Sequence, residues 1–192
     1  LLTQEGICGN EEFPDATHNV ILPFTRMLNG AADYTICYYD KRLKNTHAHQ
    51  LAASLVFYSP LQTIFWYDNP TMYGGEPEVK WFEDLVTTFD ESRVLSGYPG
   101  KGIVMARRNG DTWWVGAMAN NEGGEVEINL DFLDPAGKYM AEIYTDGGEK
   151  VKTRTHVKIE NRKVSTKDKL KFRMEPRGGV AIRIAPRPEM KK

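Results

Sequence analysis

Hydrophobic and polar positions follow two different rhythms along this chain. In the first half, residues 43–58 carry an apolar stripe at helical spacing, which predicts one helix that ends before Pro60. The positions of this stripe are Leu43, His47, Leu51, Leu55 and Tyr58. Short runs of apolar, aromatic and β-branched residues at 33–39 and 61–67 predict two buried strands.

Further helical stretches are predicted on either side of these strands. They cover residues 23–28 and residues 77–86, the second with Pro77 in its first turn. The resulting order of helix, strand, helix, strand, helix is typical of parallel βαβ units. A complete (β/α)8 barrel needs about 250 residues. We therefore expect residues 1–90 to be the C-terminal portion of such a TIM barrel.

The second half has the rhythm of short strands. Glycines recur about every ten residues, as at Gly110 and Gly137, and the run from Glu125 to Leu130 alternates polar and apolar side chains. The predicted strands are 103–107, 112–119, 125–130, 139–144, 151–159, 170–174 and 180–184. This pattern indicates an antiparallel β-sandwich over residues 91–192. The expected fold class is thus α/β plus all-β.

Composition and charge exclude some classes of partner. The chain has 25 Lys and Arg against 26 Asp and Glu, a net charge of −1, and no basic stripe, which argues against a nucleic acid partner. No apolar run approaches the roughly 20 residues of a membrane span. Cys8 and Cys37 can be buried thiols or a disulfide, and the sequence does not decide.

The chain opens at Leu1 without a methionine, and chemically active side chains follow at once. We interpret it as a chain that has lost its beginning, with which an export signal can also have been lost.

The densest group of chemically active side chains lies near this end. It consists of Glu5, Glu11, Glu12, Asp15 and His18. Loops that follow the strands of a barrel form its active face, and we expect this segment to be one of them. Carboxylates there suit proton donation to a glycosidic oxygen or binding of a hard cation such as calcium. A solvated acidic loop is the alternative.

Aromatic and histidine positions give weaker signals. Trp66 and Asp68 end a predicted strand, where they suit sugar stacking and a substrate hydrogen bond, although core packing fits Trp66 equally well. His47 and His49 point in different directions on a helix, so they cannot chelate one ion. We expect a core position for His47 and an exposed one for His49.

Neighbouring tryptophans mark one predicted strand of the sandwich. Trp113 and Trp114 must face opposite sides of a sheet. The one that faces away from the core is expected to bind sugar or to pack against the barrel.

Several longer motifs resemble one family. The stretch 3–11 (TQEGICGNE) looks like an E-G-x-x-G-x-E pattern. Other matching segments are 18–28 (HNVILPFTRML), 33–35 (DYT), 46–52 (THAHQLA), 58–62 (YSPLQ), 90–95 (DESRVL) and 106–108 (ARR). Together they are similar to glycoside hydrolase family 97, the calcium-dependent α-glucosidases and α-galactosidases. The match covers nearly the whole chain.

The resemblance implies roles for particular residues. Glu11 would be the general acid, with Glu5 and Glu11 as calcium ligands. From the positions of the residues themselves, His18, Trp66 and Asp68 are predicted to contact the substrate. Glu12 beside Glu11 departs from the pattern and leaves two candidates for the acid, of which the spacing from Glu5 favours Glu11. In the family the second catalytic carboxylate lies upstream, as an Asp nucleophile in retaining members or Glu bases in inverting ones.

The resemblance also implies partners and a location. The expected partners are an oligosaccharide substrate, the missing N-terminal part of the same chain, and a second copy in a homo-oligomer. The protein would be periplasmic or secreted. These 192 residues alone are expected to be catalytically inactive. Two alternatives remain open for the sandwich, a non-catalytic carbohydrate-binding module and an oligomerisation module.

Overall fold

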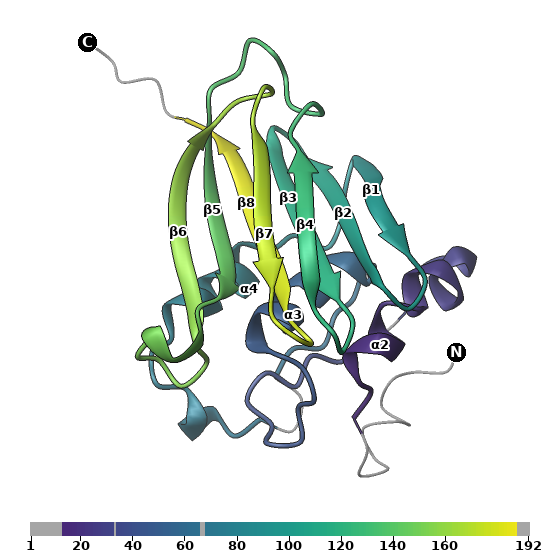
Figure 1. Cartoon of the computed structure of the whole chain (residues 1–192), viewed down its shortest axis with the longest axis vertical. Helices are drawn as coiled ribbons and strands as arrows, with labels where there is room; N and C mark the ends of the chain where they lie inside the picture. The colour runs from purple at the N-terminus through teal and green to yellow at the C-terminus, as the bar shows by residue number, and fades with distance from the viewer. Residues whose placement is uncertain (1–12, 33, 66–67, 188–192) are drawn as a thin grey trace.

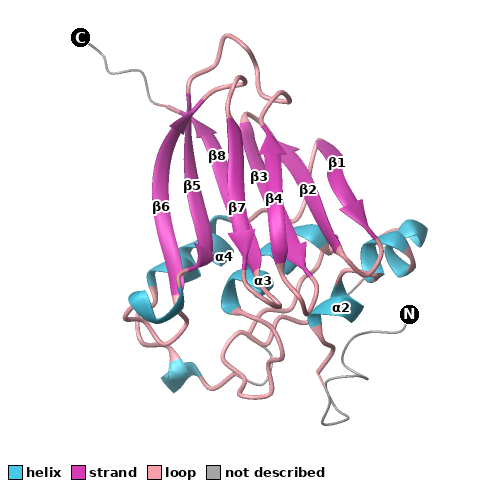
Figure 2. Cartoon of the chain, in the orientation of Figure 1, coloured by secondary structure: helices cyan, strands magenta, loops and turns pink. Residues whose placement is uncertain are grey.

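The computed structural model describes residues 13–32, 34–65 and 68–187. These residues form three layers, a two-stranded sheet, a six-stranded sheet, and a layer of short helices and loops (Figure 1). Most regular structure is antiparallel sheet, and the helices are few and short (Figure 2). In the part of the chain described, no helix has the length and hydropathy of a membrane span.

The larger sheet has the strand order β1-β2-β3-β8-β5-β6, and the smaller pairs β4 with β7. The strands are β1 (Glu91–Tyr98), β2 (Gly102–Asn109), β3 (Thr112–Ala119), β4 (Gly124–Asn129), β5 (Tyr139–Asp146), β6 (Val157–Val164), β7 (Lys169–Met174) and β8 (Gly179–Pro186). The helices are α2 (Ala16–Asn19), α3 (His47–Val56) and α4 (Lys80–Asp84). The 3-10 turns are η1 (Leu22–Phe24), η2 (Arg26–Asn29), η3 (Pro70–Met72), η4 (Pro77–Val79) and η5 (Gly148–Lys150).

The predicted antiparallel sandwich is confirmed, with two differences. The strand predicted from Val151 begins only at Val157, because the backbone N–H of Gly147 bonds the carbonyl of His156 at 2.8 Å and closes a loop there. Strand β1 was not anticipated, since its apolar Val94 and Leu95 are neighbours and do not alternate. Its register with β2 shifts just after Val94, which breaks the period of two that sequence patterns detect.

The first core lies between the two sheets. Inward-facing side chains of β3, β5 and β8 meet Ile128 of β4 and Leu170 of β7, all fully or nearly fully buried. Trp113 belongs to this core and packs against Phe132, with ring centroids 4.7 Å apart. The alternation along β3 therefore supplies the core as expected.

The second core lies between the other face of the six-stranded sheet and helix α3. Trp114 points to this side and meets Trp81 of α4 edge to face, with centroids 5.1 Å apart. Of the two expectations for the outward tryptophan, packing is the one observed. Glycines bring the layers together, because a Cβ on Gly116 would lie 2.9 Å from the carbonyl oxygen of Ala52, and one on Gly179 would lie 2.7 Å from the Cα of His49.

The two strands predicted in the first half do not form ladders among the described residues. They are represented by one parallel bridge, between Ile36 and Ile64. The barrel portion expected over residues 1–90 is therefore not evident as a sheet in this structure.

The expectation that His49 is exposed is wrong. Helix α3 is buried from Ala48 to Val56, because the sheet covers one side and the preceding segments cover the other. His49 has no exposed surface, while His47 is partly buried against Tyr38, with ring centroids 4.9 Å apart. The apolar stripe marks only one face of this helix, whereas the surrounding sheet and segments bury its other faces as well, so a position off the stripe is also buried.

Candidate functional site

A polar cluster lies where the two bridged segments of the first half end. Because Ile36 and Ile64 pair in parallel, the residues that follow each segment reach the same edge. There the backbone N–H of Tyr39 donates a hydrogen bond to Oδ1 of Asp68 at 2.9 Å. In open and closed parallel sheets, this carboxyl edge is where ligands bind.

Asp68 is the most unusual carboxyl group of this cluster. Its Oδ2 is buried and has no hydrogen-bond partner among the described residues. Burial raises the pKa of Asp68 from 3.8 to about 6, even though the backbone N–H of Tyr39 acts in the opposite direction. A carboxyl group with such a pKa takes up and gives up a proton near neutral pH.

Glu76 and Arg154 complete one side of the cluster. The Tyr39 hydroxyl donates to Oε2 of Glu76 at 3.0 Å, and Nε of Arg154 donates to Oε1 at 2.8 Å. The Arg154 guanidinium lies 4.1 Å from the centre of the Tyr39 ring and also donates to the Met72 carbonyl. Burial acts to raise the pKa of Glu76, but hydrogen bonds from its surroundings, including Tyr39 and Arg154, hold it below its usual value.

A second tyrosine and carboxylate lie deeper. The Tyr38 hydroxyl donates to Oε1 of Glu78 at 3.1 Å. Glu78 is completely buried, and its Oε2 has no partner within the part of the chain that the structure describes. Tyr38 also packs edge to face on Phe82, with centroids 5.3 Å apart. Burial and the nearby Glu78 raise the pKa of Tyr38, so its hydroxyl stays protonated and acts as a donor.

The structure describes only some of the predicted site residues, and these lie in different places. Glu5, Glu11 and Trp66 lie outside the described residues. His18 is exposed at the end of α2, where its backbone N–H bonds the capping Oδ1 of Asp15 at 2.8 Å. Of the predicted substrate contacts that are described, Asp68 belongs to the polar cluster.

Sequence reasoning missed Tyr39, Glu76 and Arg154. Arg154 lies in the loop between β5 and β6, 78 positions after Glu76, so no local pattern connects them. The loop between β5 and β6, which contains η5 and Arg154, lies at the end of these strands where the helices and loops of the first half gather (Figure 1). The second half of the chain therefore supplies a charged side chain to the cluster built by the first half.

The described ranges hold no cluster of metal ligands. Residues 13–32, 34–65 and 68–187 contain no group of three or more His, Cys, Asp or Glu side chains placed to hold an ion. The predicted calcium ligands Glu5 and Glu11 lie beyond these ranges.

Comparison with known proteins gives consistent results. Residues 88–185 match the family described as "Glycosyl-hydrolase 97 C-terminal, oligomerisation". A retaining alpha-galactosidase of Bacteroides thetaiotaomicron is 32% identical over 96% of this chain and 30% of its own length. The chain thus spans about a third of the length of this curated relative.

Solved structures of glycoside hydrolases also resemble this chain. A glycoside hydrolase family 97 enzyme from Pseudoalteromonas sp. strain K8, in complex with acarbose, superimposes with a TM-score of 0.86 and 32% identity over 97% of this chain and 31% of that one. A beta-arabinopyranosidase superimposes with a TM-score of 0.78 and 28% identity over 95% of this chain and 30% of that one. Because the family profile matches just over half of its residues, this chain belongs to glycosyl hydrolase family 97 and contains that family's C-terminal region.

Proposed function

We propose that the protein carrying this chain is a retaining α-glycosidase that removes terminal α-galactosyl or α-glucosyl residues from oligosaccharides. The observation that carries this proposal is the 32% identity to a retaining alpha-galactosidase over 96% of the chain. The acarbose complex of a relative supports an α-glucoside as the second substrate class. The protein would act in the periplasm or outside the cell.

The proposed chemistry uses two carboxyl groups. In retaining glycosidases one acts as acid and then base, and the other, about 5–5.5 Å away, forms a covalent glycosyl intermediate. Glu11 is the proposed acid, and the nucleophile would come from a part of the protein that precedes this chain. His18, Trp66 and Asp68 are the proposed substrate contacts. The raised pKa of Asp68, about 6, suits a group that shares a proton with a sugar hydroxyl.

Calcium is proposed as the metal, with Glu5 and Glu11 as ligands. Carboxylate oxygens are the ligands that this hard cation prefers, and a bound ion would orient the acid and stabilise negative charge. Within the described ranges, no group of three or more His, Cys, Asp or Glu side chains forms a competing site.

The first half is proposed to complete a (β/α)8 barrel together with preceding residues. The parallel bridge between Ile36 and Ile64 supports two neighbouring barrel strands. The hydrogen bond from Tyr39 to Asp68 supports an active face at their carboxyl ends. The six-stranded sheet would then pack against the barrel through α3.

The test is hydrolysis by the full-length protein. We expect release of 4-nitrophenol from its α-galactoside or α-glucoside, loss of activity on chelation of calcium, and an α-anomer as the first product by NMR. The 192-residue chain alone is expected to release none. Absence of hydrolysis of both substrates by the calcium-loaded full-length protein would refute the proposal, and a β-anomer would refute retention.

Self-association is a second proposed role, carried by the sandwich. The matching family is described as an oligomerisation region, and it covers residues 88–185. Sedimentation velocity of the full-length protein tests this role, since a strictly monomeric species at micromolar concentration would contradict it.

A further inference from the structure

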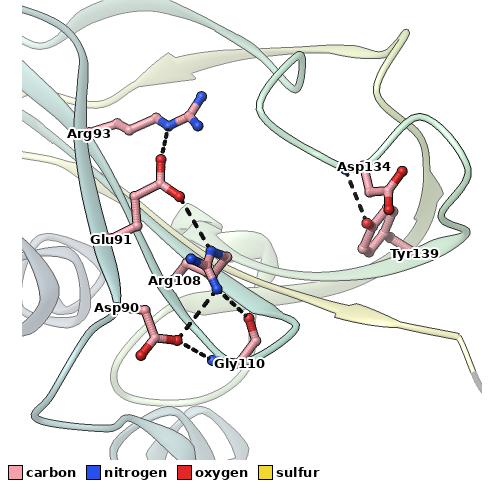
Figure 3. Close-up of polar contacts among 7 residues, drawn as sticks. All are labelled: Asp90, Glu91, Arg93, Arg108, Gly110, Asp134 and Tyr139. Atoms are coloured by element: carbon pink, nitrogen blue, oxygen red, sulfur yellow. Dashed lines mark hydrogen bonds and ion pairs between the residues drawn. The ribbon is translucent and has the colours of Figure 1, made fainter.

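A second cleft lies far from the polar cluster, at the other end of the six-stranded sheet. It has a volume of about 450 Å³ and is formed by the start of β1, the turn between β2 and β3, and the loop before β5. Small-molecule sites in proteins occupy roughly 300–1,000 Å³. In Figure 3 the two walls face each other, with Glu91, Arg93 and Arg108 on one side and Asp134 and Tyr139 on the other.

The first wall holds two guanidinium groups in place. Nε of Arg93 donates to Oε1 of Glu91 at 2.6 Å, and Nε of Arg108 lies 3.4 Å from Oε2 of the same carboxylate (Figure 3). Both guanidinium groups lie over the Trp113 ring, at 5.4 and 5.9 Å from its centre. Because one carboxylate and one ring fix both arginines, little side-chain entropy remains to be lost when a ligand binds.

The first wall also has hydrogen-bond donors that the described residues do not use. Within the described part of the chain, no hydrogen bond engages the two terminal nitrogens of Arg93. These nitrogens are donors to any ligand oxygen that enters the cleft.

The opposite wall supplies an acceptor and an apolar surface. The backbone N–H of Asp134 donates to the Tyr139 hydroxyl at 3.2 Å, which fixes the loop against the ring (Figure 3). Oδ1 of Asp134 accepts from the backbone N–H of Ala136 at 2.8 Å. Phe132 packs against Trp113, and the small exposed parts of both rings line the floor between the walls.

The charges of the residues that line the cleft indicate the class of ligand. The lining has two arginines and three carboxylates, those of Glu91, Asp111 and Asp134, so its net charge favours neither an anion nor a cation strongly. Donors and acceptors close together over an aromatic floor instead complement a molecule with many hydroxyl groups and an apolar face. We propose that this cleft binds a neutral sugar unit of an oligosaccharide, at a site separate from the proposed catalytic centre.

The test is a binding titration of the full-length protein with maltotriose and with raffinose. We expect saturable changes in the NMR signals of the Arg93 Nε–H and the Trp113 indole N–H. Arg93→Ala should weaken this binding at least tenfold, and Arg93→Gln should weaken it similarly while it keeps more of the packing on Trp113. The titration is made in a Glu11→Gln variant as well, where turnover of the sugar is blocked, and the changes at Arg93 and Trp113 should persist there.

The chain offers a closely matched control. Arg162 on β6 has a side chain 45% exposed and pairs with Glu160, two positions away, at 2.6 Å. The corresponding values for Arg93 and Glu91 are 46% and 2.6 Å. Arg162→Ala should leave sugar binding unchanged.

Three results would overturn the proposal. The first is the absence of a saturable change in the NMR signals of Arg93 and Trp113. The second is an equal weakening of sugar binding by Arg93→Ala and Arg162→Ala. The third is a change of the sedimentation coefficient in Arg93→Ala when the protein binds no sugar. The last would assign the cleft to a protein interface.

Discussion

The guanidinium of Arg107 on β2 donates a hydrogen bond from Nε to the carbonyl oxygen of Leu55, near the end of α3, at 2.9 Å. A terminal nitrogen of Arg107 reaches the Val56 carbonyl at 3.2 Å. The last carbonyls of a helix have no partner within the helix, and a cation there also opposes the negative end of the helix dipole. This buried arginine therefore joins α3 to the six-stranded sheet.

Arg107→Met should destabilise the fold. The substitution keeps apolar volume but leaves two buried carbonyl groups without donors, so we expect a loss of about 2–4 kcal/mol in the free energy of unfolding. Urea denaturation measures it. Arg108→Met is the matched control, because Arg108 is the next residue on the strand and points to the other face, and its more exposed ion pairs contribute roughly 0–1 kcal/mol. Equal losses in the two variants would contradict this role for Arg107.

Gly116→Ala should also destabilise the fold. The added Cβ would lie 2.9 Å from the Ala52 carbonyl oxygen and 3.0 Å from a methyl group of Val56, so helix and sheet must separate. Overpacking of this kind costs about 1–3 kcal/mol. Ser96→Ala on the exposed β1 is the reference and should stay within about 0.5 kcal/mol. An unchanged melting temperature for Gly116→Ala would show that the layers do not approach so closely.

His49 should stay neutral at mildly acid pH. Its Nδ1 lies 3.2 Å from the Gly178 carbonyl, which can only accept, so Nδ1 carries the proton, and Nε2 accepts from the Asn19 amide at 3.2 Å. Burial lowers its pKa from 6.5 to about 4. An NMR titration should therefore find the His49 ring neutral at pH 5, with the proton on Nδ1.

The same histidine should make stability depend on pH. The unfolded chain binds a proton at His49 as pH falls below 6.5, whereas the folded chain does so only near 4, so stability is lost as pH falls through this window. The loss amounts to about 3 kcal/mol at most. The pKa of Asp146, raised by burial to about 6, acts in the opposite direction. The difference between the protein and its His49→Gln variant isolates the histidine, and a constant difference from pH 7 to 4 would contradict the assignment.

Asp68→Asn should separate stability from activity. The amide oxygen can still accept from Tyr39, and removal of a carboxylate that burial disfavours should leave stability at pH 8 unchanged or higher. If Asp68 contacts substrate, the full-length enzyme should lose at least tenfold in kcat/KM. Unchanged kcat/KM would assign Asp68 a purely structural role.

The sandwich was predictable because its strands obey local rules. Glu125 to Leu130 alternates, glycines mark the turns, and the side chains at Trp113 and Trp114 separate to two cores as a period of two requires. The sequence pattern does not predict strand β1, because a register shift interrupts the alternation of its side chains. The exposure of His49 was wrongly predicted because burial depends on what covers a helix, which the period of the helix does not encode.

The candidate site was predictable only in part. The position of Asp68 after an apolar run predicts it as a substrate contact, and this role stays a prediction. Arg154 and Glu76 meet through the packing of distant segments, which no sequence pattern predicts. No feature of the neighbouring sequence distinguishes Arg154 from the other charged residues of its loop. The roles of Glu5 and Glu11 come from the family resemblance and stay predictions.

The proposed acid can be tested by exchanging Glu11 and its neighbour separately in the full-length protein. Glu11→Gln should lower hydrolysis of melibiose or maltose by about 10²–10⁴-fold, the usual contribution of a general acid. It should lower hydrolysis of the matching 4-nitrophenyl glycoside far less, because that leaving group needs little protonation. Glu12→Gln should leave both rates nearly unchanged. Loss of activity in Glu12→Gln with retention in Glu11→Gln, or full activity in both variants, would contradict the assignment of Glu11 as the catalytic acid.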